Sequence, residues 1–151
     1  MRHHRDVRLQ ILAIVGAVAL ASAVAVVAMA SSSANGLPSY TNGYAKWPRL
    51  NKKPFTSTGP LSSAHTGVKN VYASKRKVGK RYPNGTVVVK TIQPTGRKGK
   101  PYQVAVMRKL NAKWRYIEYQ LSGDRYTVLA QGQLCQSCHM AARANDYVFT
   151  R

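Results

Sequence analysis

The residues best suited to chemistry lie near the C-terminus, in the stretch LCQSCHMAARANDYVFTR (134–151). This stretch contains both cysteines of the chain, Cys135 and Cys138, followed directly by His139. Cys-x-x-Cys-His is the sequence to which haem c is attached. Two thiols on one helical turn reach the two vinyl groups of a porphyrin, and the next imidazole lies beneath the iron as its proximal ligand. The motif therefore predicts one covalent haem c, with His139 as the iron ligand.

Three other interpretations of this motif compete with haem attachment. A disulfide between Cys135 and Cys138 would close a very short loop and stabilise the fold little. A thiol redox pair is typical of a βαβ unit, whereas this chain has the pattern of consecutive strands. A zinc site needs a fourth ligand, for which only His65 is available. We favour haem c because the complete pentapeptide occurs together with a signal for export.

The export signal is the N-terminal segment. Three arginines occur in its first eight residues, and 11–30 then form an apolar run without a charge that ends in the small-x-small pattern AMA. This is the organisation of a signal peptide, and twenty apolar residues are also long enough to span a bilayer. We expect 1–30 to be a signal peptide or an N-terminal membrane anchor helix. The rest of the chain is then periplasmic or otherwise extracytoplasmic, secreted or anchored to the inner membrane.

The charge balance is strongly basic. The chain has 24 Lys and Arg against four Asp and Glu, a formal net charge of +20. Removing 1–30 takes away three basic residues and one acidic residue, which leaves about +18. Such a field attracts acidic proteins, anionic lipids or nucleic acid. No nucleic-acid-binding motif is present and an exported chain rarely meets nucleic acid, so we expect an acidic redox partner protein, with membrane association through 11–30.

The body of the chain has the pattern of a mainly β (α+β) protein. Residues 31–63 are rich in Ser, Asn, Gly and Pro and predict an irregular linker or N-terminal segment, and we expect 64–151 to form the haem-binding domain. Short turns predict hairpins and an antiparallel sheet of about five strands. A short C-terminal haem-binding helix is expected within 132–145. Val, Ile, Tyr and Thr runs place the strands at 68–74, 86–93, 102–110, 114–121 and 125–131.

The second axial position of the iron distinguishes an electron carrier from a protein that binds small ligands. Met140 adjoins the proximal ligand and cannot reach the opposite face. Met107 and His65 remain as sixth-ligand candidates, Met107 in a strand-like run and His65 in a loop. Nothing in the sequence points to either, so we expect an open distal face. The candidate walls of its pocket are Val88, Val104, Val106 and Met107.

The C-terminal sequence CQSCHMAARANDYVFTR resembles the end of the cytochrome P-460 family, in which Asp, an apolar pair and Phe-Thr follow the haem motif at this spacing. The resemblance extends upstream and covers most of 64–151. It rests there on three strands: VYAS (71–74), NGTVVVK (84–90) and WRYIEY (114–119).

This resemblance implies a mainly β fold, commonly homodimeric. The family includes enzymes that oxidise hydroxylamine, in which a lysine is covalently linked to the porphyrin edge. It also includes the similar cytochromes c′-beta, which lack that link and bind nitric oxide. The lysine that ends the GTVVVK strand is Lys90, which matches the cross-linking position. Strand alternation puts Thr86, Val88 and Lys90 on one face.

The hydroxylamine-oxidising members also place a carboxylate over the distal face as a proton acceptor. The matching strand here, 102–110, has no Asp or Glu, and Ala105 or a neighbour stands at that position. Glu118 substitutes as the base only if its side chain points inward. The expected function is binding or oxidation of small nitrogen species (hydroxylamine, nitric oxide) at an open haem face. The alternative is an electron-transfer cytochrome with a sixth ligand, which docks an acidic redox partner.

Overall fold

The structure is a computed structural model and describes residues 33–56 and 65–150. The predicted signal peptide or anchor over 1–30 lies outside the described residues. Within the two described ranges, no helix combines the length and the hydropathy needed to cross a membrane.

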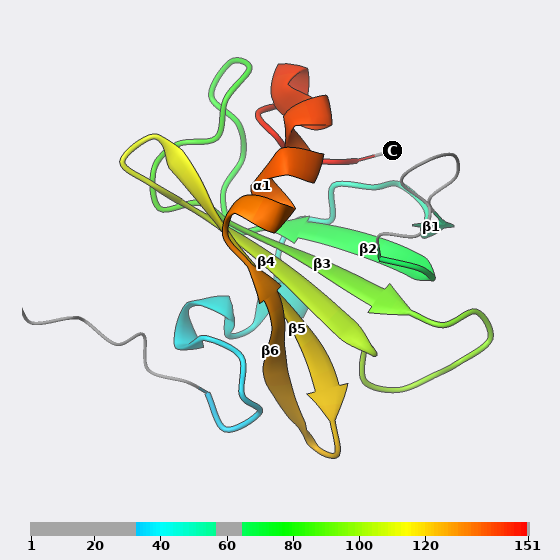
Figure 1. The fold of residues 1–151 in the computed structure, drawn as a ribbon. Helices are drawn as coiled ribbons and strands as arrows, with labels where there is room; N and C mark the ends of the chain where they lie inside the picture. The colour runs from blue at the N-terminus through cyan, green and yellow to red at the C-terminus, as the bar shows by residue number, and fades with distance from the viewer. Residues whose placement is uncertain (1–32, 57–64, 151) are drawn as a thin grey trace, which may run out of the picture.

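The described chain is built around one antiparallel sheet, whose strands follow one another in sequence order (Figure 1). The antiparallel sheet and its mainly β character confirm the predicted fold class. The sheet has six strands instead of about five, because a short additional strand pairs with the edge of the predicted set. That strand has two residues and follows Pro54, so no period of alternating residues marks it in the sequence. The strands are β1 (Phe55–Thr56), β2 (Val68–Ala73), β3 (Val87–Gln93), β4 (Gln103–Leu110), β5 (Lys113–Ser122) and β6 (Arg125–Gln131).

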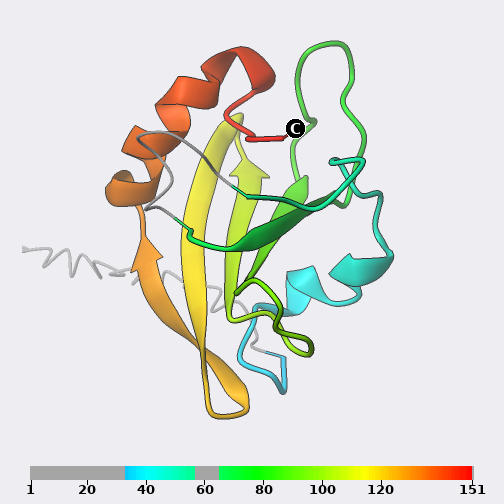
Figure 2. The same cartoon turned by 90° about the vertical axis from the view of Figure 1, so that its right-hand side faces the viewer.

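Short helices lie on the two faces of this sheet (Figure 2). On one face are two 3₁₀ helices, η1 (Ser39–Thr41) and η2 (Tyr44–Lys46). The other face carries α1 (Gln133–His139), which continues directly into the 3₁₀ helix η4 (Met140–Asn145). The predicted C-terminal helix is therefore present over 133–145, split between two helix types.

Each face of the sheet has its own hydrophobic core. On β3, Val87 and Val89 pack with η1 and η2, whereas Val88 packs beneath the C-terminal segment. The alternation of side chains along a strand produces this division. β3 is therefore buried on both faces. Its even-numbered residues share the face of Val88 and point towards the C-terminal helices.

The C-terminal segment is fixed to the sheet by a buried ion pair. The Nζ of Lys109 on β4 lies 2.7 Å from Oδ2 of Asp146, and each side chain is 5% exposed. The backbone N–H of Tyr82 donates a second hydrogen bond to the same carboxylate oxygen, at 2.8 Å. Burial alone raises the pKa of Asp146, but these hydrogen bonds outweigh it and hold the pKa below its usual value. The pair therefore positions the residues that follow α1.

Candidate functional site

The Cys-x-x-Cys-His motif occupies α1 and begins just after the sheet ends. Gly132, with φ of +71°, links β6 to the helix in a conformation that favours glycine. Cys135 is half-buried and faces the sheet, Cys138 is exposed, and both thiols are free. His139 ends the helix and is buried. One helical turn thus presents both thiols and the imidazole, as the motif predicts.

The ring of His139 is held in one orientation. Its Nδ1–H donates a hydrogen bond of 2.7 Å to the backbone carbonyl of Tyr147. The rings of Tyr116 and Phe149 flank it, with centroids 4.9 and 5.2 Å away. Burial lowers the pKa of His139 to about 4, so the imidazole is neutral near pH 7. A neutral imidazole whose Nδ1–H is bonded to a carbonyl leaves Nε2 available to a metal.

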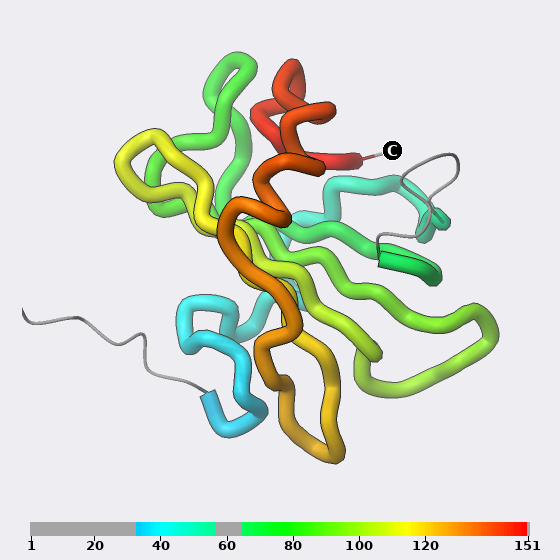
Figure 3. Tube along the Cα trace, viewed as in Figure 1, coloured from blue at the N-terminus to red at the C-terminus, as the bar shows by residue number. Residues whose placement is uncertain are grey.

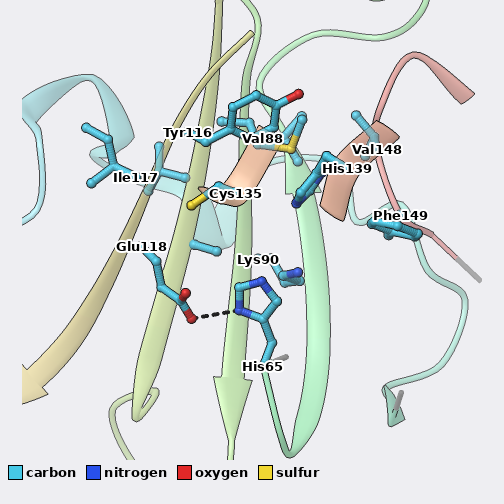
Figure 4. A pocket seen from close by; sticks show the side chains of 13 residues that line it. His65, Val88, Lys90, Tyr116, Ile117, Glu118, Cys135, His139, Val148 and Phe149 are labelled. Atoms are coloured by element: carbon cyan, nitrogen blue, oxygen red, sulfur yellow. Dashed lines mark hydrogen bonds and ion pairs between the residues drawn. The ribbon is translucent and has the colours of Figure 1, made fainter. Parts of the chain in front are cut away.

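A pocket of about 420 Å³, including its open mouth, lies between this helix and the sheet (Figure 4). Its floor is a row of residues that pair across three strands: Lys90 lies opposite Ala105, and Ala105 lies opposite Glu118. The small Ala105 side chain leaves space between the two charged residues. The pocket is lined by His65, Val88, Lys90, Ala105, Val106, Met107, Tyr116, Ile117, Glu118, Cys135, His139, Val148 and Phe149.

Lys90 is a buried amine inside this pocket, with 9% of its surface exposed. Among the residues that the structure describes, no group pairs with its Nζ. Burial lowers the pKa of Lys90 to about 8, against an opposing effect of the nearby Glu118 carboxylate. A substantial fraction of the amine is therefore neutral near pH 8, and a neutral amine is a nucleophile.

Glu118 also points into the pocket, as the role of a base requires. Its Oε1 lies 2.7 Å from Nδ1 of His65, and the two side chains are 13% and 19% exposed (Figure 4). His65 precedes β2 and has φ of +59°, a left-handed conformation that is uncommon outside glycine. The sequence suggested roles for Glu118 and His65 separately. Their contact could not be predicted, because 53 positions separate them and His65 lies in a loop without a periodic pattern.

The structure separates the predicted walls of the pocket. Val88 and Met107 lie opposite each other on β3 and β4 and both line it. Val104 packs in the core on the opposite face of the sheet and does not line the pocket; Val106 borders the pocket but packs in that same core. Strand alternation accounts for this, because residues 104 and 106 cannot share a face with 107.

Several lining residues were not singled out from the sequence. Tyr116 on β5 lies opposite Met107 on β4. The alternation of side chains along β5 would have predicted that Tyr116 faces the pocket. Val148 and Phe149 follow the turn at Asp146, so only the folded C-terminal segment brings them to the pocket.

The donor set of this site fits haem c. One helical turn carries two free thiols and an imidazole with an open Nε2; Cys135 and His139 line the mainly apolar pocket, and Cys138 is exposed beside them. Across 33–56 and 65–150, no three His, Cys, Asp or Glu side chains gather to hold a separate metal ion. The zinc interpretation therefore finds no support in this part of the chain, and the two free thiols give none to the disulfide.

Comparison with known protein families agrees with this site. The family model of cytochrome P460 matches residues 41–150, which includes the whole sheet and the Cys-x-x-Cys-His motif. No curated protein matched the sequence. Proteins of this family carry a covalent haem c with its iron, as the donor set here requires. The chain therefore belongs to the cytochrome P460 family and is a mono-haem c-type cytochrome.

Proposed function

We propose that the protein oxidises a small nitrogen species such as hydroxylamine at the haem, and that Glu118 receives protons from the substrate. The observation that carries this proposal is the position of Glu118, which shares the pocket with His139 and is bonded to His65. This places a carboxylate in the pocket although β4 has none. The second activity that the pocket allows is reversible binding of nitric oxide.

Oxidation of hydroxylamine removes protons together with electrons. A haem held by Cys135, Cys138 and His139 would supply an iron for the nitrogen species, and would pass the electrons on to an external electron acceptor. A proton acceptor must lie within hydrogen-bond reach of the substrate. Glu118 is the one carboxylate of the described residues that lines this pocket. The Nδ1–H of His65 donates to Glu118 and keeps the carboxylate turned inward, away from solvent.

The apolar walls serve a different part of the proposal. Val88, Met107 and Phe149 line the same pocket and exclude water from the space where a ligand lies. Binding of nitric oxide needs this space and an open iron position but no base. It is therefore expected to persist when proton transfer is blocked.

Lys90 carries the covalent part of the proposal. Its amine is buried and unpaired among the described residues and faces the pocket. These are the conditions under which a lysine becomes a nucleophile. We propose that Lys90 is linked to the porphyrin edge and holds the haem at a third point, in addition to the two thioethers. The C–N bond forms as one N–H and one porphyrin C–H bond break, and the two electrons and two protons released pass to an external oxidant such as a peroxide.

A second candidate function is electron transfer with His65 as the sixth ligand. His65 lies in the same pocket as His139, and its Nε2 makes no hydrogen bond with the residues that the structure describes. Met107 lines the same pocket as a thioether alternative. Either ligand would close the distal face and produce a low-spin haem.

The optical spectrum of the ferrous holoprotein distinguishes these functions. A broad, strongly red-shifted Soret band indicates the lysine link and supports oxidation of hydroxylamine. An ordinary high-spin spectrum that changes on addition of nitric oxide supports a ligand-binding protein. A sharp low-spin spectrum that no ligand changes overturns the proposal in favour of electron transfer. Export, the periplasmic location and the homodimer stay predictions of the sequence.

A further inference from the structure

Among the described residues, no exposed carboxylate lies at the end of the molecule that carries the C-terminal helices. Glu118 lies in the pocket and Asp146 is buried against Lys109. Asp124 is exposed, but it lies in the turn between β5 and β6, at the end of the sheet away from α1 (Figure 1). The surface near the C-terminal helices therefore has no acidic side chain among the described residues.

Basic side chains gather at this same end. In Figures 2 and 3, the loop between β2 and β3 lies beside the C-terminal segment. The turn between β4 and β5 lies next to this loop. We call the exposed basic residues of these segments the basic rim. It consists of Lys75, Arg76, Lys80, Arg81, Lys113 and Arg143.

Hydrogen bonds attach the rim to the haem-binding segment. The Nζ of Lys77 donates to the side chain of Asn145 in η4. The turn between β4 and β5 is attached to the β2–β3 loop, because the backbone N–H of Ala112 donates a hydrogen bond of 2.8 Å to Asn84 Oδ1. A protein that binds the rim is consequently placed against the segment that carries His139, where Cys138 is exposed.

The tip of the β2–β3 loop adds an apolar contact to the rim. Val78 is 76% exposed. In the sequence it lies between two pairs of basic residues of the rim, 75–76 and 80–81. The backbone of Val78 and Arg81 exchanges hydrogen bonds of 2.9 and 3.3 Å across a tight turn, in which Gly79 has φ of +59°. The turn is thus formed before any partner binds. An apolar centre with a charged surround is the usual composition of a protein interface.

We propose that the basic rim, with Val78 at its centre, is the docking surface for an acidic electron-carrier protein. The proposal rests on the haem c function stated above. In the exchange, one electron leaves the ferrous haem iron and reduces the oxidised partner; no bond forms or breaks and no proton moves. A protein fits this surface better than a membrane does, because the loop exposes one aliphatic side chain and no aromatic ring, less than an interfacial membrane segment presents.

The test compares two variants of the holoprotein that lose equal charge. Lys80→Gln/Arg81→Gln alters the rim, and Arg97→Gln/Lys98→Gln alters the exposed loop at the opposite end of the sheet. Each reduced protein is mixed with an oxidised acidic blue-copper protein, and stopped-flow absorbance gives the rate constant of electron transfer. We expect the rim variant to be slower by about tenfold at low salt. The control variant should change less than about twofold, and the difference should vanish at high salt.

Binding is measured separately by calorimetric titration of the two reduced proteins, between which no electron passes. The rim variant and Val78→Ser should both weaken the complex. Equal losses in the two charge variants, or a rate in the unaltered protein that does not depend on salt, overturn the proposal. Rim-dependent binding to phosphatidylglycerol vesicles with an unchanged electron-transfer rate replaces the protein partner with a membrane. Nitric oxide binding by the rim variant reports on the haem site independently.

Discussion

Lys90 and Glu118 project from β3 and β5 on either side of Ala105, and both enter the pocket that His139 closes. The two residues carry opposite charges but are bonded differently. Glu118 is hydrogen-bonded to His65, whereas Lys90 makes no hydrogen bond or close ion pair with the described residues and feels Glu118 only as a nearby charge. The pocket therefore contains a fixed carboxylate and an amine that is available for reaction.

Replacing Glu118 by Gln is expected to separate oxidation from binding. The amide keeps the shape of the side chain but cannot accept a proton at neutral pH. The turnover number for hydroxylamine should fall by about 10²–10⁴, while nitric oxide still binds. Steady-state kinetics and optical titration measure the two effects.

The matched control is Asp124→Asn, which makes the same chemical change at an exposed carboxylate and should leave both properties unchanged. Full hydroxylamine turnover in the Glu118→Gln protein would remove Glu118 from the mechanism.

Lys90 is expected to react with a pH dependence of its own. Burial lowers its pKa to about 8, so below that pH the neutral fraction of the amine rises about tenfold per pH unit. In the haem-free chain, acylation of Lys90 should therefore increase from pH 6 to about 8 and then level off. Mass spectrometry of the labelled peptide measures this, with exposed lysines of the same digest as reference. A rate that continues to rise beyond pH 9 would contradict a buried, perturbed amine.

The holoprotein gives a second readout of Lys90. Lys90→Arg keeps the positive charge but removes the primary amine. We expect this variant to lose the red-shifted Soret band while Cys135 and Cys138 still bind the haem. An unchanged spectrum would show that no lysine link existed.

The Lys109–Asp146 pair is expected to dominate the stability of the C-terminal segment. Asp146→Asn leaves the buried ammonium of Lys109 without its counter-charge, which costs about 3–5 kcal/mol in the free energy of unfolding. Because the pKa of Asp146 is below its ordinary value, the unfolded chain binds more protons than the folded one in acid. The contribution is thus complete above the ordinary pKa and is lost as pH falls through the lowered value.

Denaturant unfolding between pH 7 and pH 2 checks both statements. The unaltered protein should lose stability in acid more steeply than Asp146→Asn does. Equal slopes for the two proteins would mean that the pair contributes nothing to the acid sensitivity.

The sequence predicted the strands and the motif well because both are local. Runs of Val, Tyr and Thr determine β2 to β6, and a pentapeptide defines the attachment site. The pocket depends on register, which no run of residues reveals. The pairing of Lys90 with Ala105 puts residues 105 and 107 of β4 on the pocket face, while Val104 lies in the core of the opposite face and Val106 only borders the pocket.

The same register makes a rescue experiment possible at Ala105. Residues directly opposite each other in an antiparallel sheet have Cβ atoms about 4.5–5.5 Å apart, so a carboxylate introduced at 105 enters the pocket beside position 118. In a Glu118→Gln background, Ala105→Glu should therefore recover part of the lost hydroxylamine turnover. Thr127→Glu, which adds a carboxylate at an exposed position of β6, should recover none. Rescue by both changes would mean that net charge is what matters. Rescue by Ala105→Glu alone would show that the reaction requires a carboxylate in the pocket and tolerates its transfer from β5 to β4.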